Sequence, residues 1–306
     1  MQPNFTNDNK QKIKVIQLSF WQRLPVIVRS VLIGAFMAII GTAPWAILVS
    51  VNIKYWSAVP WAVLPTALYI WLYWRFAKGD GWPQSTTDAR RKFCRANNLP
   101  GEVWGMALFA GTLGLIALVL FLNVMNRMVR LPEQSTGNLS NIPFITLFLL
   151  LIMCAVVAGV AEEVSFRGYM QGPIERRCGP VVAILVTGTL FGFAHFTHPE
   201  VTIILMPYYI AAAAIYGILA YLTNSILPSI VLHAGGNMFS SLGLFTQGRS
   251  EWQASANKNP LIWQTGTDAA FWFSCVATIF MGAVAVWAYR SLQTITQKYQ
   301  NSTKSI

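Results

Sequence analysis

Residues 144–163 read FITLFLLLIMCAVVAGVAEE, a run of eighteen residues without a charge that ends directly in two glutamates. The hydrocarbon core of a bilayer is about 30 Å thick and needs about 20 helical residues, with shorter spans allowed. The run therefore predicts a membrane-spanning helix. An ionisable pair at membrane depth is costly, so Glu162 and Glu163 predict a functional site, with a structural ion pair at a helix end as the alternative.

The composition of the whole chain supports the same class. Of its 306 residues, 55% are hydrophobic and only 11% are charged, and the mean hydropathy is +0.48. A soluble domain carries about 25% charged residues and cannot hide so much apolar surface. The chain also holds 12 Trp, 18 Phe and 10 Tyr, as membrane interfaces favour. These values exclude soluble, disordered, coiled-coil and disulfide-rich secreted proteins.

Seven further apolar segments surround this run, and lipid leaves helices as the default for all of them. We therefore predict an all-α fold, a polytopic membrane bundle of about eight transmembrane helices. The second segment contains Pro60 and Pro65, which we expect to kink it. The eight segments are approximately Val26–Val51, Tyr55–Phe76, Val103–Met125, Phe144–Ala161, Val181–Phe196, Val201–Leu222, Ile226–Phe245 and Ala269–Tyr289.

The distribution of Lys and Arg predicts the orientation. With the N-terminus in the cytoplasm, the inner side receives 17 of these residues and the outer side only 5, which are Lys54, Arg127, Arg130, Arg249 and Lys258. This bias places both termini in the cytoplasm, in a cell inner or plasma membrane. It also accounts for the net charge of +11 without nucleic acid. The longest inner loop, Gly79–Pro100, is basic and suits an interfacial helix.

The segments group into four parts. Residues 1–25 form a cytoplasmic N-terminal segment, and residues 26–142 form N-terminal transmembrane helices with the basic loop. Residues 143–246 are predicted to form the transmembrane core that carries the functional site, and residues 247–306 the last transmembrane helix and a cytoplasmic tail.

Further polar side chains stand in the apolar segments near the glutamates. Arg167 follows Glu163 by four residues, one helical turn, and can pair with it. His195 ends the fifth segment, and His233 and Asn237 share one face of the seventh at i and i+4. Each of these residues alone is a weak signal, because a solitary His or Asn often only links two helices.

Register predicts that these residues meet. Residues 176–180 read RRCGP and indicate a tight turn. Glu162 lies sixteen residues before Cys178 and His195 sixteen residues after Gly179, so an antiparallel hairpin brings both to the same depth, about 24 Å from the turn. His233 lies about 13 Å beyond the turn at Asn224-Ser225. The glycines at 235 and 236 are expected to let neighbouring helices approach closely.

The three motifs E162-E-V-S-F-R167, F191-G-F-A-H195 and H233-A-G-G-N237 resemble the EExxxR, FxxxH and HxxxN motifs of the CAAX protease and bacteriocin-processing family of intramembrane proteases. The resemblance covers about Phe144 to Leu244. It implies an eight-helix fold and an endopeptidase that opens toward the cytoplasm. Eukaryotic members remove the last three residues of prenylated CAAX proteins, whereas bacterial members have varied substrates. The implied partners are a membrane-associated protein or peptide substrate and the lipid bilayer.

In the expected mechanism, Glu162 is the base that activates water, and Arg167 keeps Glu163 charged and orienting. His195 polarises the water, and His233 and Asn237 hold the developing oxyanion. The alternative is a zinc site on His195 and His233, with Glu162 as third ligand or as base, although HExxH is absent.

Two other classes of function stay open. The first is a non-catalytic immunity or binding protein that retains the pocket. The second is a proton-coupled transporter that uses Glu162, Glu163 and His195 as a relay. The transporter is disfavoured because the two halves show no matching pair of broken helices.

Overall fold

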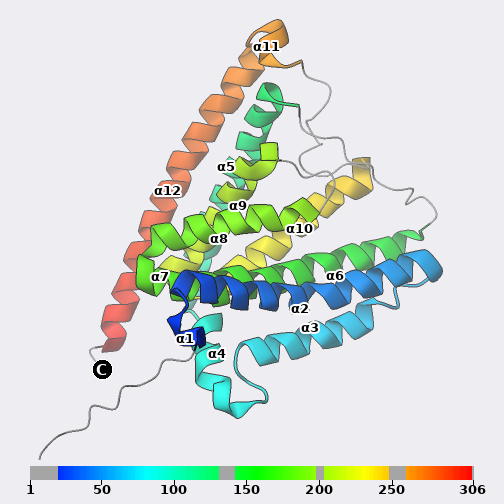
Figure 1. Ribbon diagram of the computed structural model, residues 1–306. Coiled ribbons are helices and arrows are strands. Elements are labelled where there is room, and N and C mark those ends of the chain that lie inside the picture. Colours follow the sequence, from blue (N-terminus) through cyan, green and yellow to red (C-terminus); the bar gives the residue numbers. More distant parts are fainter. Residues whose placement is uncertain (1–19, 131–141, 198–202, 248–259, 305–306) are drawn as a thin grey trace, which may run out of the picture.

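The computed structural model describes residues 20–130, 142–197, 203–247 and 260–304, and within these ranges the chain is helical without strands (Figure 1). The elements are α1 Phe20–Arg23, α2 Val26–Tyr55, α3 Val63–Ala77, η1 Gln84–Thr86, α4 Thr87–Cys94, α5 Gly101–Met128, α6 Phe144–Glu162, η2 Glu163–Gln171, α7 Gly172–Cys178, α8 Pro180–Ala194, η3 His195–Thr197, η4 Ile203–Leu205, α9 Met206–Thr223, α10 Leu227–Gln247, α11 Ile262–Thr265 and α12 Ala269–Lys304. Most of the predicted segment 1–25 falls outside the described residues.

Five of the described helices are long and apolar enough to cross a membrane, which confirms a helical, polytopic membrane protein. They are Val26–Tyr55, Gly101–Met128, Phe144–Cys178, Ile203–Thr223 and Ala269–Ser302. The helix Pro180–Ala194 is apolar but shorter. Each of the eight predicted segments contains a helix, while a total of eight membrane spans stays a prediction.

The prolines act differently from the prediction for the second segment. Helix α3 begins only at Val63, after turns at residues 57–62, so Pro60 precedes the helix and Pro65 lies in its first turn. A proline in the first turn removes no intrahelical hydrogen bond, and the expected kink is therefore wrong. Prolines inside long helices are Pro44, in α2, and Pro173, in the uninterrupted helix Phe144–Cys178.

One continuous helix carries the glutamates, because α6, η2 and α7 follow one another without a break from Phe144 to Cys178. The middle part, Glu163–Gln171, is a π-helix, a wider turn that is rare and is frequent at functional sites. Helix α2 packs along this segment (Figure 1). A side chain at Gly34 or Gly41 would collide with Met170 or Ala161, so only glycine permits this close approach.

The predicted hairpin register is confirmed by an aromatic contact. The rings of Phe166 and Phe191 meet edge to face with centroids 5.3 Å apart. Phe166 lies twelve residues before Cys178 and Phe191 twelve residues after Gly179, so α8 returns antiparallel to η2 and α7 in the expected alignment.

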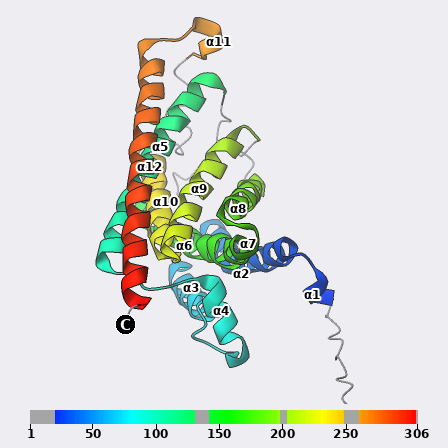
Figure 2. The same ribbon diagram turned by 90° about the vertical axis from the view of Figure 1, so that its left-hand side faces the viewer.

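The remaining helices surround this hairpin. Helices α5 and α12 pack together on one side and cross the α2–α6 pair steeply (Figures 1 and 2). Helices α9 and α10 lie between the two groups, where α9 packs against α8 and α10 packs against α6. The functional segment is thereby enclosed by helices from both halves of the chain.

The inner loop between α3 and α5 contains the short helix α4 and is attached to the turn between α9 and α10. The backbone oxygen of Arg95 accepts a hydrogen bond from the amide of Ile226 at 3.1 Å. The side chain of Asn97 donates to the Asn224 oxygen at 2.6 Å, and Ser225 Oγ donates to the Asn97 oxygen at 2.7 Å. The loop therefore holds the start of α10 in position.

Candidate active site

A buried ion-pair cluster on η2 and α10 forms the centre of the site. Oε1 of Glu163 lies 3.1 Å from Nη1 of Arg167 and accepts a hydrogen bond from Nδ1 of His233 at 2.8 Å. The side chains of Glu163 and Arg167 are 0% and 1% exposed. The pairing of Glu163 with Arg167 agrees with the spacing of four residues, and Glu163 also fixes the orientation of the His233 ring.

The guanidinium of Arg167 is held by aromatic rings as well as by charge. Its central carbon lies 4.7 Å from the ring centroid of Phe191 and 5.3 Å from that of Tyr216. Nη2 donates to the backbone oxygen of Ala213 at 3.3 Å. A buried charge needs such compensation, because removal from water is costly for a lone cation. Arg167 is thus a fixed support for Glu163.

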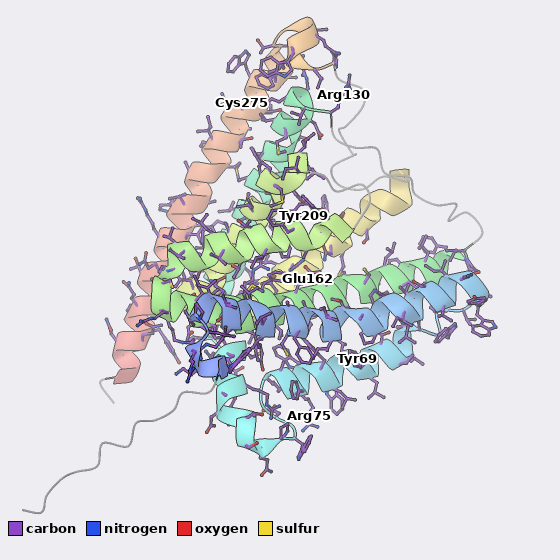
Figure 3. All side chains as sticks on the ribbon, in the orientation of Figure 1. Tyr69, Arg75, Arg130, Glu162, Tyr209 and Cys275 are labelled. Atoms are coloured by element: carbon purple, nitrogen blue, oxygen red, sulfur yellow. The ribbon has the colours of Figure 1, made fainter. Side chains whose placement is uncertain are left out.

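Glu162 occupies a different environment from its neighbour. Its side chain is 20% exposed, and its Oε2 atom lies 3.7 Å from Nε2 of His233, beyond hydrogen-bond length. Oε2 is buried and accepts no hydrogen bond from a described residue. His233 therefore lies between the two glutamates, with Nδ1 bound to Glu163 and Nε2 turned toward Glu162. Figure 3 shows Glu162 at the centre of the helical bundle.

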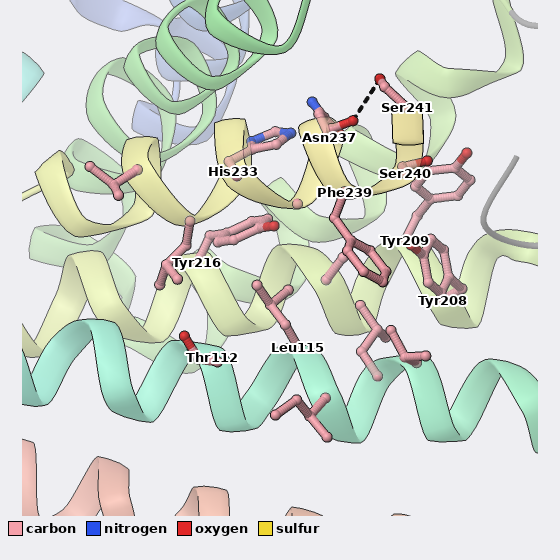
Figure 4. A pocket seen from close by; sticks show the side chains of 18 of the residues that line it. Thr112, Leu115, Tyr208, Tyr209, Tyr216, His233, Asn237, Phe239, Ser240 and Ser241 are labelled. Carbon is pink, nitrogen blue, oxygen red and sulfur yellow. Dashed lines mark hydrogen bonds between the residues drawn. The ribbon is translucent and has the colours of Figure 1, made fainter. Parts of the chain in front are cut away.

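A cavity of about 910 Å³ adjoins this cluster, enclosed by α5, α8, α9 and α10. His195, His233 and Asn237 all line it, so the structure brings these three predicted residues to one space. Figure 4 shows His233 and Asn237 on the same side of α10, one turn apart. Glu162, Glu163 and Arg167 are not among the lining residues. Glu162 is next to the cavity only through His233, whose Nε2 atom lies 3.7 Å from Glu162 Oε2.

Contacts with Phe191 and Tyr209 orient the ring of His195. Its Nδ1 donates to the backbone oxygen of Phe191, which lies 2.7 Å away, since a carbonyl only accepts. Nε2 is then the nitrogen that carries the lone pair in the neutral ring. Tyr209 stacks on the ring, with centroids 4.3 Å apart and planes 29° apart. The end of α8 thereby presents His195 to the cavity in a defined tautomer.

Close contact between α6 and α10 explains how the two glutamates reach His233. A side chain at Gly159 would meet Ala234 and the backbone oxygen of Ile230 at 2.9–3.0 Å, so these helices touch at their backbones. Gly235 and Gly236, which we expected to let neighbouring helices approach closely, do not do so: a side chain at Gly235 would meet nothing within 4 Å, and one at Gly236 would meet only the Tyr216 hydroxyl, at 3.5 Å. Both glycines line the cavity, because they lie on a different side of α10 from the α6 contact.

The sequence reasoning missed a polar network behind the site. Arg95 is 3% exposed; its Nη1 donates to both carboxylate oxygens of Glu175 at 3.1 Å, and its Nη2 donates to the Arg167 backbone oxygen at 2.5 Å. Burial lowers the pKa of Arg95, and the charge of Glu175 opposes that shift. Gln171 joins Glu175 to the Gly217 oxygen. No periodicity of α4 signals these contacts, which only the tertiary structure creates.

The aromatic supports were also missed, although a signal exists for two of them. Tyr209 and Tyr216 are seven residues apart on α9 and share a helix face. Tyr209 stacks on His195, and Tyr216 stacks on His233 with centroids 4.9 Å apart and planes 8° apart. The spacing predicts one aromatic face, but not that the face covers both histidines.

The zinc alternative stays a prediction. Across residues 20–130, 142–197, 203–247 and 260–304, no three His, Cys, Asp or Glu side chains form a group able to hold a metal ion. Of the predicted set, Glu162 and His233 approach each other to 3.7 Å, and Nδ1 of His233 is bound to Glu163.

Comparison with known proteins is consistent with this geometry. Residues 144–239 match the family model described as type II CAAX prenyl endopeptidase Rce1-like. No curated protein and no solved structure matches the chain. The matched range contains all three motifs, and these supply the ion-pair cluster and the polar end of the cavity. This match over residues 144–239 agrees with the family predicted from the motifs and supports a membrane-embedded protease.

Proposed function

We propose that the chain is an intramembrane endopeptidase in which Glu162 activates the attacking water. The observation that carries this proposal is the pairing of Glu162 Oε2 with His233 Nε2 at 3.7 Å. Hydrogen bonds to water are about 2.8 Å long, so one water molecule can contact both atoms. Oε2 is buried without a protein donor, and a polar atom of this kind is usually satisfied by water.

In the proposed reaction, Glu162 takes a proton from this water as the oxygen attacks the peptide carbonyl, and later delivers the proton to the leaving amine. Asn237 donates to the developing oxyanion, and His233 does so once its Nε2 is protonated. His195 contacts the water or the carbonyl through Nε2. Glu163 and Arg167 act through His233, because Glu163 holds the ring at 2.8 Å and Arg167 holds Glu163.

The cavity supports a substrate with an apolar part. Leu115, Ile116 and Val119 of α5 line it together with the histidines and Asn237. Figure 4 shows Leu115 on the side of the cavity across from His233 and Asn237. A peptide whose scissile bond reaches His233 would thus place neighbouring apolar groups against α5. We propose a membrane-associated protein substrate, of CAAX type or another type, which enters from the cytoplasmic side that the positive-inside bias predicts.

The first test measures cleavage by the Glu162→Gln variant in proteoliposomes. The second compares the C-termini of membrane proteins by proteomics between cells that carry the wild-type protein and cells that carry the variant. We expect Glu162→Gln to abolish cleavage while membrane insertion is retained. Asp88→Asn, a substitution in the exposed loop helix α4, is the control and should cleave normally. Cleavage at the wild-type rate by Glu162→Gln refutes the assignment. Rescue of a deletion phenotype by Glu162→Gln would instead favour the alternative that the chain is a non-catalytic immunity or binding protein.

Zinc is tested separately, by elemental analysis of purified enzyme of known specific activity. The arrangement of the described side chains leads us to expect full activity with much less than one metal ion per chain. Stoichiometric zinc that is lost together with activity in His195→Ala or His233→Ala would establish the metal mechanism instead.

A further inference from the structure

A second cavity, of about 520 Å³, lies where the first turn of α2 meets the end of α7. Its walls share no residue with the cavity at the histidines. Ile27 and Cys178 pack against the same hydrophobic cluster, so the two helix ends are held side by side, as Figures 1 and 2 both show. The lining residues are Pro25, Val26, Ile27, Arg29, Arg177 and Cys178.

Among the described residues that line this cavity, the charged side chains are those of two arginines. Neither Arg29 nor Arg177 forms an ion pair with a residue in the described part of the chain. The Nε atom of Arg29 is buried and has no hydrogen-bond partner there. Two cations that face one cavity repel each other, and an anion between them would relieve this repulsion. The chemistry therefore calls for an anionic oxygen ligand.

The position of the two arginines suggests where this ligand comes from. Helix α2 has 30 residues, and the continuous helix that ends at Cys178 has 35, so they are about 45 Å and about 52 Å long. Both lengths exceed the hydrocarbon core of about 30 Å, and their ends must extend to the level of the lipid headgroups. Arg29 is the fourth residue of α2, and Arg177 is the penultimate residue of α7.

We infer that this cavity binds the phosphodiester headgroup of an anionic phospholipid. The guanidinium of arginine matches phosphate oxygens through paired N–H donors, and basic pockets between transmembrane helices bind anionic headgroups. The four other lining residues, Pro25, Val26, Ile27 and Cys178, provide an apolar wall that suits the glycerol and acyl part of a lipid better than a free phosphate ion. The bound lipid joins α2 to the helix that carries both glutamates. This site stands independently of the peptidase chemistry.

The experiment uses the full-length, delipidated chain in neutral detergent, with the thermal unfolding midpoint and native mass spectrometry as readouts. Phosphatidylglycerol, phosphatidylcholine and inorganic phosphate are titrated in separate arms. The variants are Arg29→Gln/Arg177→Gln and Arg177→Gln alone, and Arg290→Gln, which replaces an exposed arginine of α12, is the matched control.

We expect phosphatidylglycerol to raise the unfolding midpoint of the wild type and of Arg290→Gln saturably, and the other two probes to leave it unchanged. The double variant should bind phosphatidylglycerol about thirtyfold more weakly. Arg177→Gln alone should bind it about fivefold more weakly, and because this side chain is exposed, the single variant tests the site even if the double variant does not fold. Affinity at the wild-type level in these variants overturns the proposal. Equal binding of phosphatidylcholine or of inorganic phosphate overturns it as well.

Discussion

The two adjacent glutamates offer a sharp test, since the same substitution should lower the stability strongly at Glu163 and only slightly at Glu162. Glu163→Gln keeps the shape of the side chain but removes the charge that faces Arg167 at 3.1 Å and His233 at 2.8 Å. Glu163 is 0% exposed and Arg167 is 1% exposed, so solvent does not screen the loss. Removal of one partner from a buried ion pair costs about 3–5 kcal/mol.

The aromatic rings around Arg167 place the expected value near the lower end of this range. Phe191 and Tyr216 remain in the variant and stabilise the unpaired guanidinium through cation–π contacts, each with a weight of about 0.5–2 kcal/mol. We therefore expect Glu163→Gln to lower the free energy of unfolding by about 3 kcal/mol. Glu162→Gln should change it by less than about 1 kcal/mol, because that carboxylate is 20% exposed and its nearest charged partner is 3.7 Å away.

The assay is equilibrium unfolding of both variants in mixed micelles titrated with a denaturing detergent, with peptide cleavage measured on the same preparations. Glu162→Gln should be stable and inactive, and Glu163→Gln should be destabilised and weakly active. A Glu163→Gln protein as stable as the wild type, with a destabilised Glu162→Gln, would refute the assignment of the supporting role to Glu163.

Three further outcomes are expected. Arg95→Met should destabilise the chain by about 3 kcal/mol, whereas Arg95→Met/Glu175→Leu should recover most of this loss, because the double change leaves no unpaired buried charge. Unfolding in detergent of the wild type, the two single variants and the double variant measures this double-mutant cycle, and additive losses would contradict the expectation. Gly159→Leu should push α6 from α10 and reduce cleavage more than about 100-fold, while Gly105→Leu, at an open helix position, should cleave normally; equal activity of both variants would be inconsistent with the close approach. The hydrogen bonds from Arg127 lower the pKa of Asp268 in the folded protein. This carboxylate therefore contributes stability above its ordinary pKa of about 4, and the contribution is lost as the pH falls through the lower pKa of the folded state. Unfolding followed from pH 6 to pH 2 should show this loss in the wild type and not in Asp268→Asn, and identical pH profiles would contradict the role of the pair.

Much of the site geometry follows from distances along single helices. The spacing of four residues predicted the Glu163–Arg167 pair, and the count from the Cys178–Gly179 turn predicted the register that Phe166 and Phe191 confirm. These predictions hold because a helix has a fixed rise per residue, and a short turn aligns two antiparallel helices.

Contacts between helices were less predictable. Periodicity does not state how far a helix is rotated about its axis when it packs, so the sequence left open which glutamate would contact His233 closely. The structure places Glu163 at 2.8 Å and Glu162 at 3.7 Å. The π-helical turn at Glu163–Gln171 changes this rotation further, and the three motifs do not reveal it.

The amino-acid sequence by itself determined the membrane class, the helical architecture and the register of the hairpin at the Cys178–Gly179 turn, and its motifs indicated the family, because each depends on composition or on spacing along the chain. The tertiary structure alone decided that Gly159 provides the close helix contact, that Tyr209 and Tyr216 cover the histidines, and that Arg95 supports η2 from the inner loop. These contacts join segments far apart in the chain, and their geometry depends on the packing of all the helices at once.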